Sequence, residues 1–382
     1  MRKQETRASY LPELRVLRRQ RSDHSKDDRI GRRGSMPIRI AVDTMGGDLG
    51  PDVIVRGAIQ YLLDKTSDGT ELIFVGPRET IESILTDIKA PDDRTSVENA
   101  DDVIAMDASP TDGIRKKGAS LVVAHRLVKD GKADAVVSTG NTGAVLASAM
   151  FNLGRIEGVS RPALASHFPT SNKKPCLVLD VGANSHCRVD HLLEFAYMGS
   201  IYFSQIMNVP HPRVALLSIG EEASKGNDLT VEAHRRLSSS SLNFIGNVEG
   251  RDLLSGKSDV IVCDGFVGNI ILKFAESIRG FLYGKIKRQI SSNPFSRLGA
   301  ILMGPFLRRI HKTFDYSQYG GVPLLGTNGI TIVCHGSSNA LAVMNAIRVA
   351  NDAVAKEINK HINDQLSSLR PVGQSARETG SE

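Results

Sequence analysis

The sequence predicts an α/β fold in which a mainly parallel β-sheet is covered by helices on both faces. Short, nearly continuous apolar runs alternate with longer segments of helical periodicity along most of the chain. Strands buried on both faces have this apolar character, and helices are what a parallel sheet needs to connect its strands. Glycine and small polar residues follow most of the apolar runs, which places turns at the strand ends.

The expected elements follow one another from residue 38 to residue 362. Strands are expected at residues 38–43, 71–76, 133–140, 175–184, 213–220, 242–247, 258–265 and 329–336. Helices are expected at residues 52–65, 78–88, 142–154 and 189–207, where apolar residues recur with helical spacing. The stretch 339–362 is expected to form one long amphipathic helix. A chain of 382 residues with these elements fits one large α/β unit or two domains.

Charge is distributed unevenly along the chain. Residues 1–35 contain 11 Lys/Arg and 5 Asp/Glu, which accounts for the whole formal net charge of +6. The remaining residues contain 37 basic and 37 acidic side chains. A nucleic-acid-binding protein would need a basic stripe on its folded body. The charge balance gives no support for one, so nucleic acid is not an expected partner.

Three segments are expected along the chain. Residues 1–35 are expected to be either a disordered basic extension or the product of an upstream start codon before a true start at Met36, and they lack the apolar run of a signal peptide. A weak electrostatic tether to acidic lipid is the alternative for this extension. Residues 36–362 form the expected α/β domain, and residues 363–382 an expected flexible tail.

The cysteines indicate a reducing compartment. They are Cys176, Cys187, Cys263 and Cys334. No two of them form a CxxC pair, so the sequence suggests neither a zinc site nor a disulfide framework. Three of them lie in or after strand-like runs and are expected to be buried thiols. No apolar run reaches the ~18 residues that a membrane-spanning helix needs, and the cytoplasm is the expected location.

The loops after the expected strands carry the most specific pattern. They read VDTMGGD, VSTGNTG, LDVGAN, SIGEEASKGND, IGNVEG, CDGFVGN and CHGSSN. Ligands of open parallel sheets bind beyond the carboxyl ends of the strands, where glycine permits close backbone approach and a helix N-terminus attracts anions. Turn chemistry alone explains any single loop, but seven such loops predict that at least some line one anion-binding pocket. The candidate binding residues are Asp43, Gly46, Gly47, Asp48, Gly140, Asn141, Thr142, Gly143, Asp180, Asn184, Asn227, Asp264 and Gly268.

Several other site classes lack their motifs. The sequence has no GxGxxG after the first strand, no GxxxxGK[ST], no GxSxG and no local Cys–His signature. The acids that could form a Mg²⁺ site are Asp43, Asp48, Asp180 and Asp264. Scattered acids of this kind more often cap helices or orient loops, so no metal and no cofactor are expected. Lys225 lies in a glycine-flanked loop, where a lysine is usually solvated; at the end of a strand it can instead neutralise a phosphate.

Long blocks of the sequence resemble the bacterial phosphate acyltransferase family PlsX. The blocks are IRIAVDTMGGDLGPDVIVRGA, STGNTGAVLASAMFNLGRIEGVSRPALASHFPT, LDVGANS, SIGEEASKGNDLT, NFIGNVEGRDLLSGKSDVIVCDGFVGNIILK and DYSQYGGVPLLGTNGITIVCHGSSNALAVMNAI. They are collinear from about residue 38 to about residue 362. The sequence departs from the family in a shorter segment before LVLDVGAN and in Thr44, where the family more often has alanine. Neither departure touches the candidate Asp and Gly positions.

The resemblance implies the transfer of a long-chain acyl group from acyl carrier protein to inorganic phosphate. The product would be an acyl phosphate for the first acylation of glycerol 3-phosphate in phospholipid synthesis. The family has an α/β/α sandwich fold similar to those of phosphotransacetylases and isocitrate-type dehydrogenases. It forms homodimers and works in the cytoplasm at the inner face of the membrane, which implies a membrane surface and a glycerol-3-phosphate acyltransferase as partners.

The chemistry of this reaction agrees with the residues in the loops. Phosphate is already a nucleophile and a thioester is already activated, so the protein need only hold both and stabilise the tetrahedral oxyanion. By resemblance, Lys225 would provide charge for the phosphate or the oxyanion, and Asn269 would provide a hydrogen bond. A helix N-terminus would be presented to the phosphate by Asn141, Thr142 and Gly143. The residues that would orient these groups are Asp180, Asn184 and Asp264.

The segment 295–314, FSRLGAILMGPFLRRIHKTF, is a candidate membrane element. Leu298, Ile301, Leu302 and Phe306 recur at helical spacing, and basic residues flank them. The apolar part is too short to span a bilayer, and Pro305 is expected to kink or break a helix. A helix pair packed at a dimer interface is one interpretation. The other is a segment that dips into the bilayer with its basic residues on anionic headgroups.

Three other functions are compatible with parts of this sequence. A phosphotransacetylase that uses acyl-CoA has the same fold, and the sequence does not separate the two thioester donors because both present phosphopantetheine. A decarboxylating dehydrogenase would need a clustered acidic metal site and an arginine-rich pocket, which the sequence does not indicate. A non-catalytic membrane scaffold would not need the glycine-rich strand ends.

Overall fold

A computed structural model describes residues 37–368, with gaps at residues 65, 66, 68, 173, 314, 315 and 319. The expected basic extension at residues 1–35 and residues 369–382 of the expected tail lie outside the described residues. Side chains are described throughout this range except those of residues 279, 307–313 and 316. The elements below belong to one unit that begins at Ile38.

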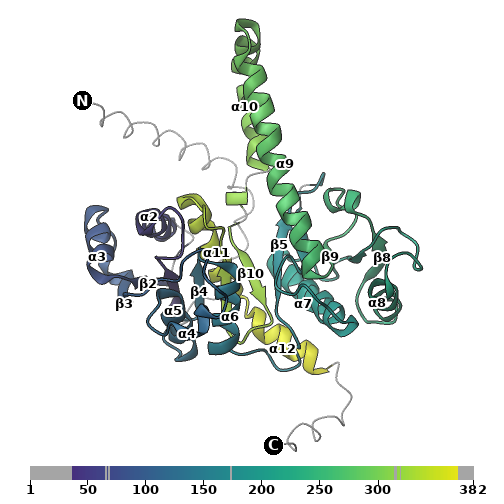
Figure 1. Ribbon diagram of the computed structural model, residues 1–382, viewed down its shortest axis with the longest axis horizontal. Coiled ribbons are helices and arrows are strands. Elements are labelled where there is room, and N and C mark those ends of the chain that lie inside the picture. Colours follow the sequence, from purple (N-terminus) through teal and green to yellow (C-terminus); the bar gives the residue numbers. More distant parts are fainter. Residues whose placement is uncertain are drawn as a thin grey trace, which may run out of the picture. The chain divides into compact units, whose positions relative to one another are not determined.

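Eleven strands of the described chain form one sheet (Figure 1), in the order β3-β2-β1-β4-β11-β10-β5-β6-β9-β7-β8. The first half of the sheet contains β1 (Ile38–Asp43), β2 (Thr70–Gly76), β3 (Thr95–Asn99), β4 (Ala135–Ser138) and β11 (Ile330–Val333). The second half contains β6 (Cys176–Leu179), β7 (Val214–Leu217), β8 (Phe244–Val248) and β9 (Val260–Val262). The halves are joined by β10 (Val322–Leu325) and β5 (Ala163–Phe168).

The two halves of the sheet run in opposite directions. Strands within each half pair in parallel. The pairs β11–β10, β10–β5 and β5–β6 are antiparallel. Because the chain direction reverses three times, the carboxyl ends of β6, β7, β8 and β9 lie on the side of the sheet where β1, β4 and β11 begin. The sheet is therefore mainly parallel, as expected, but it consists of two parallel halves joined by antiparallel pairs.

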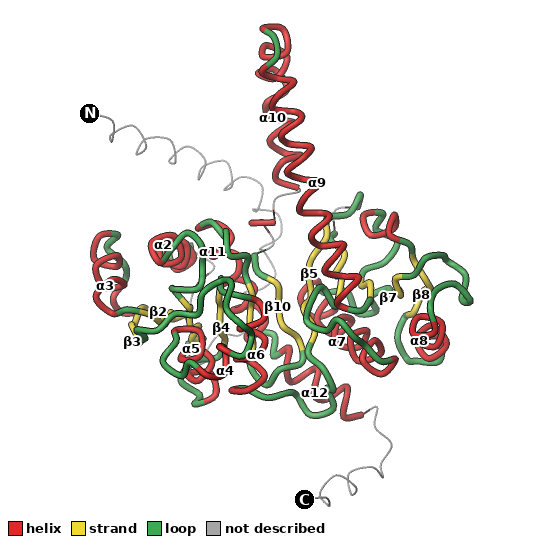
Figure 2. Tube along the Cα trace, in the orientation of Figure 1, coloured by secondary structure: helices red, strands yellow, loops and turns green. Residues whose placement is uncertain are grey.

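Helices cover both faces of the sheet, which confirms the predicted three-layer α/β/α arrangement (Figure 2). One face carries α2 (Pro51–Leu62), α3 (Arg78–Asp87), α7 (Val189–Met207), α8 (Asp228–Ser238), α11 (Ala340–Ala355) and α12 (Ile358–Ser368). The other face carries α4 (Asp112–Arg115), α5 (Ser120–Lys129), α6 (Thr142–Asn152) and α9 (Gly265–Ser291). The alternation of side chains along β1 supplies both cores: Ile40 and Val42 pack on the side of α2 and α11, whereas Ala41 packs on the side of α5.

Helices α9 and α10 (Pro294–Thr313) lie side by side and extend away from the three layers (Figure 1). We refer to them as the α9–α10 pair. Pro305 was expected to kink or break the second helix; the break does not occur, because α10 continues through Pro305. Ile301 and Leu302, one turn earlier, are 74% and 73% exposed.

The C-terminal helical region differs from the expected single helix. The chain forms α11 and α12, with Glu357 between them in a left-handed conformation (φ 47°). This break allows Ile358 and Ile362 to turn into the core beneath α7. Helix α12 ends at Ser368, six residues beyond the expected domain boundary at 362, and Leu366 within that extension is buried.

Candidate functional site

Three strand-end loops of the first half of the sheet meet at one place. They contain Gly46 and Gly47 after β1, Gly140 after β4 and Gly336 after β11. A Cβ atom on Gly46 would lie 2.6 Å from the backbone nitrogen of Gly140, and the amide of Asp48 donates a hydrogen bond to the carbonyl of Gly336 (2.9 Å). Glycine thus serves here to let one loop backbone pack directly on another.

Asp43 holds these loops from within. Its side chain is 1% exposed and accepts hydrogen bonds from the hydroxyls of Ser120 (2.6 Å) and Ser138 (2.7 Å) and from the amide of Met45 (3.3 Å). Burial raises the pKa of Asp43, and these hydrogen bonds oppose that effect because they stabilise the carboxylate. A buried carboxylate with these partners orients the loops and ties β1 to β4 and to the start of α5.

Sequence reasoning missed both serines that hold Asp43. Ser138 lies within the STGNTG motif, so the motif itself contained the information that could have identified it. Ser120 is 77 residues from Asp43 in the sequence and lies in no motif that pointed to it. Only the packing of α5 against β1 brings that hydroxyl to the carboxylate.

The N-terminus of α6 lies beside these loops, as expected. The side-chain oxygen of Asn141 accepts a hydrogen bond from the amide of Ala144 (2.9 Å), and its NH₂ group donates to the carbonyls of Met106 (2.6 Å) and Ala108 (3.2 Å). The side chain of Asn141 is therefore engaged in capping the helix and tying down a loop. The groups left for an anion are backbone N–H groups of the first turn, which contains Thr142 and Gly143.

Asp180 organises a second group of loops, after β6. Its side chain is fully buried and accepts hydrogen bonds at 2.7–3.1 Å from the amides of Leu164, Gly182, Ala183 and Asn184 and from the side chain of Asn184. Burial raises the pKa of Asp180, and the N–H donors oppose this. The side chain of Asn184 also donates to a backbone carbonyl (2.7 Å). Both side chains therefore hold the loop after β6 together.

The N-terminus of α9 packs against this loop. Asp264 caps the helix by accepting hydrogen bonds from two backbone amides of the first turn (3.0 and 2.9 Å). A Cβ atom on Gly268 would lie only 1.9 Å from the carbonyl oxygen of Asp180. Asn269 follows in the helix, and its Oδ1 atom lies 3.4 Å from the position that a Cβ atom on Gly182 would occupy. The close packing thus places the exposed side chain of Asn269 next to the loop after β6.

Lys225 lies in the loop between β7 and α8. Its side chain is exposed, and no ion pair to it is found among the side chains that the structure describes. Asn227 caps α8 by accepting a hydrogen bond from the amide of Thr230 (3.0 Å), so its side-chain oxygen serves the helix. Strands β6, β9 and β7 are neighbours in the sheet. The loops of Asp180, Asn269 and Lys225 therefore emerge next to one another.

The strand-end loops form two groups, so the seven loops do not all line one pocket. The loops of the first half and those of the second half leave the sheet on opposite sides, because β5 and β10 reverse the chain direction between them. A strand of four residues separates the two sides by only ~13 Å. Of the two groups, the one after β6, β7 and β9 combines a lysine, a side-chain amide and a helix N-terminus. It is the candidate site for a phosphate group.

The cysteines are not poised for chemistry. Cys176, Cys263 and Cys334 are buried, as predicted, and Cys187 is half-buried. Burial raises the pKa of the Cys176 and Cys334 thiols to about 12 and that of Cys187 to about 11. A nucleophilic cysteine needs a lowered pKa. These thiols therefore stay protonated at neutral pH.

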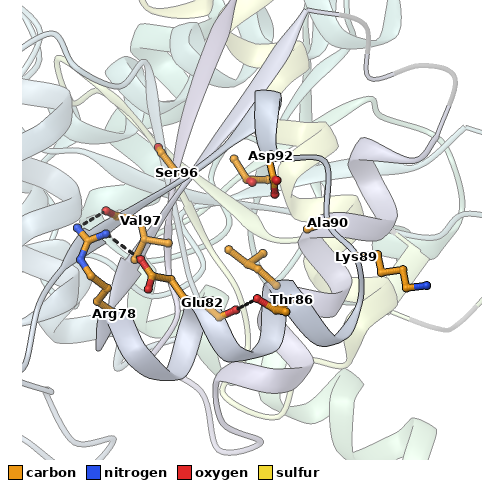
Figure 3. A pocket seen from close by; sticks show the side chains of 10 residues that line it. Arg78, Glu82, Thr86, Lys89, Ala90, Asp92, Ser96 and Val97 are labelled. Carbon is orange, nitrogen blue, oxygen red and sulfur yellow. Dashed lines mark hydrogen bonds and ion pairs between the residues drawn. The ribbon is translucent and has the colours of Figure 1, made fainter.

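A hollow of about 690 Å³ lies between α3 and β3. Figure 3 shows the side chains that line it. Arg78 lines it and is engaged with the carboxylate of Glu82 (3.0 Å) and the carbonyl of Val97 (2.9 Å). None of the residues predicted for anion binding lines this hollow. It is separate from the candidate site.

Within the described residues, no three His, Cys, Asp or Glu side chains are arranged to hold a metal ion. The helices of the same part of the chain include none that is both long and apolar enough to cross a membrane.

The α9–α10 pair concentrates positive charge that the overall balance of the chain conceals. Residues 265–313 contain nine Lys/Arg and one Glu, a net charge of +8, so the rest of residues 36–382 carries a net −8. The folded body is therefore neutral only in sum, and its net positive and net negative charges lie in different parts of the chain. The apolar residues predicted to form one face of α10 are exposed in the structure: Leu298 by 59%, Ile301 by 74%, Leu302 by 73% and Phe306 by 61%.

Comparison with known proteins gives a consistent set of relatives. A model of the family described as "Fatty acid synthesis protein" matches residues 38–361. A phosphate acyltransferase of Moorella thermoacetica is 51% identical over 314 residues, which cover 82% of this chain and 91% of that protein. A phosphate acyltransferase of Heliobacterium modesticaldum is 48% identical over 338 residues, which cover 88% of this chain and 100% of that protein.

Solved structures with the same fold are more distant in sequence. A phosphotransacetylase from Streptococcus pyogenes aligns with a TM-score of 0.57 at 18% identity and covers 84% of this chain and 94% of its own. The EutD phosphotransacetylase from Staphylococcus aureus aligns with a TM-score of 0.54 at 15% identity, with coverage of 83% and 94%. At these identities the likeness concerns the fold alone.

Proposed function

Because the chain belongs to the PlsX family of phosphate acyltransferases, we propose that it transfers a long-chain fatty acyl group from acyl carrier protein to inorganic phosphate. Phosphate acyltransferase activity follows from the family; the carrier-protein donor, the long chain and the mechanism are the proposal. The product is an acyl phosphate, which a glycerol-3-phosphate acyltransferase would consume in phospholipid synthesis.

The proposed mechanism is direct attack of phosphate on the thioester. A phosphate oxygen forms a bond to the carbonyl carbon, and the carbonyl oxygen becomes an oxyanion. The C–S bond then breaks, and the departing thiolate takes up the proton that phosphate loses. Lys225 supplies positive charge to the phosphate or the oxyanion, and Asn269 donates a hydrogen bond to one of them. A protein nucleophile is unnecessary, in line with the raised pKa values of the thiols.

One observation carries the proposal: the loops of Lys225 and Asn269 follow the adjacent strands β7 and β9, and α9 begins there. A cation, an amide and a helix N-terminus together suit a phosphate and a developing oxyanion. The N-terminus of α6, on the other side of the sheet, offers a further place for an anionic part of the substrates. That group includes Asp43, Gly46, Gly47, Asp48 and the first turn of α6.

We also propose that the α9–α10 pair meets a second copy of the chain and the membrane surface. The pair exposes large apolar side chains such as Phe274 and Phe281 in α9 and Leu302 in α10. Exposed apolar surface of this extent marks an interaction site, and its basic residues suit anionic headgroups. A homodimer that rests on the cytoplasmic face of the membrane would cover the exposed apolar side chains and bring the basic residues to anionic headgroups.

Acyl phosphate formation by the purified protein tests the proposed reaction. Long-chain acyl-ACP and acyl-CoA are offered separately with inorganic phosphate, and acyl phosphate is trapped with hydroxylamine. We expect product from acyl-ACP at the higher kcat/KM. A preference for acyl-CoA would indicate a phosphotransacetylase instead. If neither donor gives product, a non-catalytic scaffold would be favoured.

Two substitutions test the catalytic assignment. We expect Lys225→Ala and Asn269→Ala to lower the rate by ~10²–10³, the usual cost of losing one group that stabilises an oxyanion. Both variants should keep the thermal stability of the parent. Lys273→Ala is the control, because this exposed lysine of α9 pairs with Glu276 (3.0 Å) and has no assigned role in the site. Near-full turnover of either catalytic variant would refute its assignment.

A further inference from the structure

The loop between β7 and α8 holds Lys225 by its backbone. The hydroxyl of Ser218 donates a hydrogen bond to the carbonyl of Lys225 (2.8 Å), and the amide of Lys225 donates to the carbonyl of Glu222 (3.0 Å). The side chain itself is exposed. A lysine side chain loses rotamer entropy when it is held in one geometry. A lysine that must meet a phosphate in one geometry therefore benefits from a fixed backbone.

Gly220 provides the surface on which the stem of Lys225 lies. A Cβ atom at Gly220 would be 2.8 Å from Cγ and 3.1 Å from Cβ of Lys225. Gly226, directly after the lysine, has a φ of 124°, which L-residues rarely adopt. The chain thus bends directly after Lys225, and the start of the lysine stem lies against Gly220.

Asn247, in β8, reaches the same turn from a neighbouring strand. Its NH₂ group donates a hydrogen bond to the carbonyl of Glu222 (2.9 Å), the same oxygen that accepts from the amide of Lys225. Its Oδ1 atom lies 2.8 Å from Nδ1 of His234 in α8, which fixes the orientation of the amide. Asn247 is 6% exposed. Its hydrogen bonds are therefore shielded from competing water.

We propose that Asn247 and Ser218 are positioning residues for the acyl transfer. Asn247 fixes the turn through the Glu222 carbonyl, Ser218 fixes the carbonyl of Lys225, and together they set where the lysine stands. The inference rests on the proposed role of Lys225 at the phosphate or the oxyanion. Because a displacement of about 1 Å can cost about 100-fold in rate, loss of either tether lowers activity although neither residue touches substrate.

A double-mutant cycle in the full-length protein separates positioning from a purely structural role. The kcat and the KM for phosphate are measured for the parent, Asn247→Ala, Lys225→Ala and the double variant, and circular dichroism with thermal melting verifies folding. We expect Asn247→Ala to lower kcat/KM by about 10- to 100-fold in the parent. In the Lys225→Ala background, the loss should be below about 2-fold, since no lysine is left to misplace.

Asn243→Ala is the matched control for this cycle. Asn243 lies just before β8, and its exposed side chain donates to the carbonyl of His211 (3.1 Å), away from the Lys225 loop. It should keep the parent activity. If Asn247→Ala does not fold, Ser218→Ala takes its place with the same two expectations, since it removes one half-exposed hydroxyl.

Each outcome has one meaning. Equal losses in both backgrounds, or parent activity of the folded Asn247→Ala and Ser218→Ala variants, would overturn the positioning role and leave the role of Lys225 intact. Full activity of Lys225→Ala would instead refute the proposed role of the lysine, and the positioning inference with it.

Discussion

Acid should destabilise this fold through His125, whose ring is fully buried between α5, α6 and β11. Nδ1 lies 3.0 Å from the carbonyl of Leu121 and 3.0 Å from the hydroxyl of Ser148, and Nε2 lies 3.4 Å from the hydroxyl of Thr331. A carbonyl only accepts hydrogen bonds, so Nδ1 carries the hydrogen of a neutral ring. Burial lowers the pKa of His125 from 6.5 to about 4.

The size of the effect follows from proton linkage. The unfolded chain protonates this histidine as the pH falls through 6.5, and the folded chain does so only near pH 4. The stability that depends on the neutral ring is therefore complete above pH 6.5 and is lost between pH 6.5 and pH 4. A pKa difference of about 2.5 units corresponds to ~3 kcal/mol in the free energy of unfolding.

Denaturant unfolding of the parent and of His125→Gln, at pH values from 7 to 4 and one protein concentration, measures this. The buried carboxyls of Asp43 and Asp180 have raised pKa values and shift both curves in the opposite direction as the pH falls. The difference between the two proteins isolates His125. We expect the stability advantage of the parent to shrink by ~3 kcal/mol from pH 7 to pH 4. Parallel curves for the two proteins would refute the reasoning.

Two further predictions concern α9 and α10. Gly268→Ala places a Cβ atom 1.9 Å from the backbone carbonyl oxygen of Asp180, so this variant should lose ~1–3 kcal/mol of folding stability through overpacking and melt at a lower temperature. Gly280→Ala in the same helix is the control: its Cβ atom meets no atom within 4 Å, and it should gain up to ~1 kcal/mol of stability. Equal melting temperatures of the two variants would contradict this prediction. Leu302→Glu should abolish co-sedimentation of the protein with vesicles that contain anionic lipid, because it places a charge on the exposed apolar face of α10. Leu63→Glu is the control, since Leu63 lies at the end of α2 and is 71% exposed. Unchanged sedimentation of the folded Leu302→Glu variant would count against α10 as the membrane element.

Much of the layered fold could be predicted because the relevant information is local. The run at residues 38–43 coincides with β1, and the pattern at 142–154 contains α6. Strands β3, β5 and β10 were not predicted. β3 is an edge strand with exposed positions and a polar sequence, TSVEN, and β10 contains Pro323. These segments form strands because they pair with neighbouring strands of the sheet, some of which lie far away in the sequence.

The arrangement of the site was harder to predict than its residues. The strand-end loops were correctly recognised as loops, but their grouping depends on the three antiparallel pairings around β10 and β5, which no local pattern encodes. The capping roles of Asn141 and Asn227 were also hidden, because the residue types that cap helices are the ones that bind anions. The segregation of charge was not predicted either. The net charge of residues 36–382 is zero, because the positive charge of the α9–α10 pair cancels the negative charge of the remaining residues in the sum.

Helix α9 connects the proposed reaction centre with the proposed partner surface. Asn269 lies in its second turn, beside the loop of Asp180, and the helix continues to Ser291 before α10 begins. At 1.5 Å per residue, the 22 residues after Asn269 span ~33 Å. If the far end of the α9–α10 pair rests on a membrane, the reaction centre therefore stands well outside the lipid. A carrier protein in the aqueous phase can then reach Lys225 and Asn269 directly, and the acyl group must cross that distance after it has become an acyl phosphate.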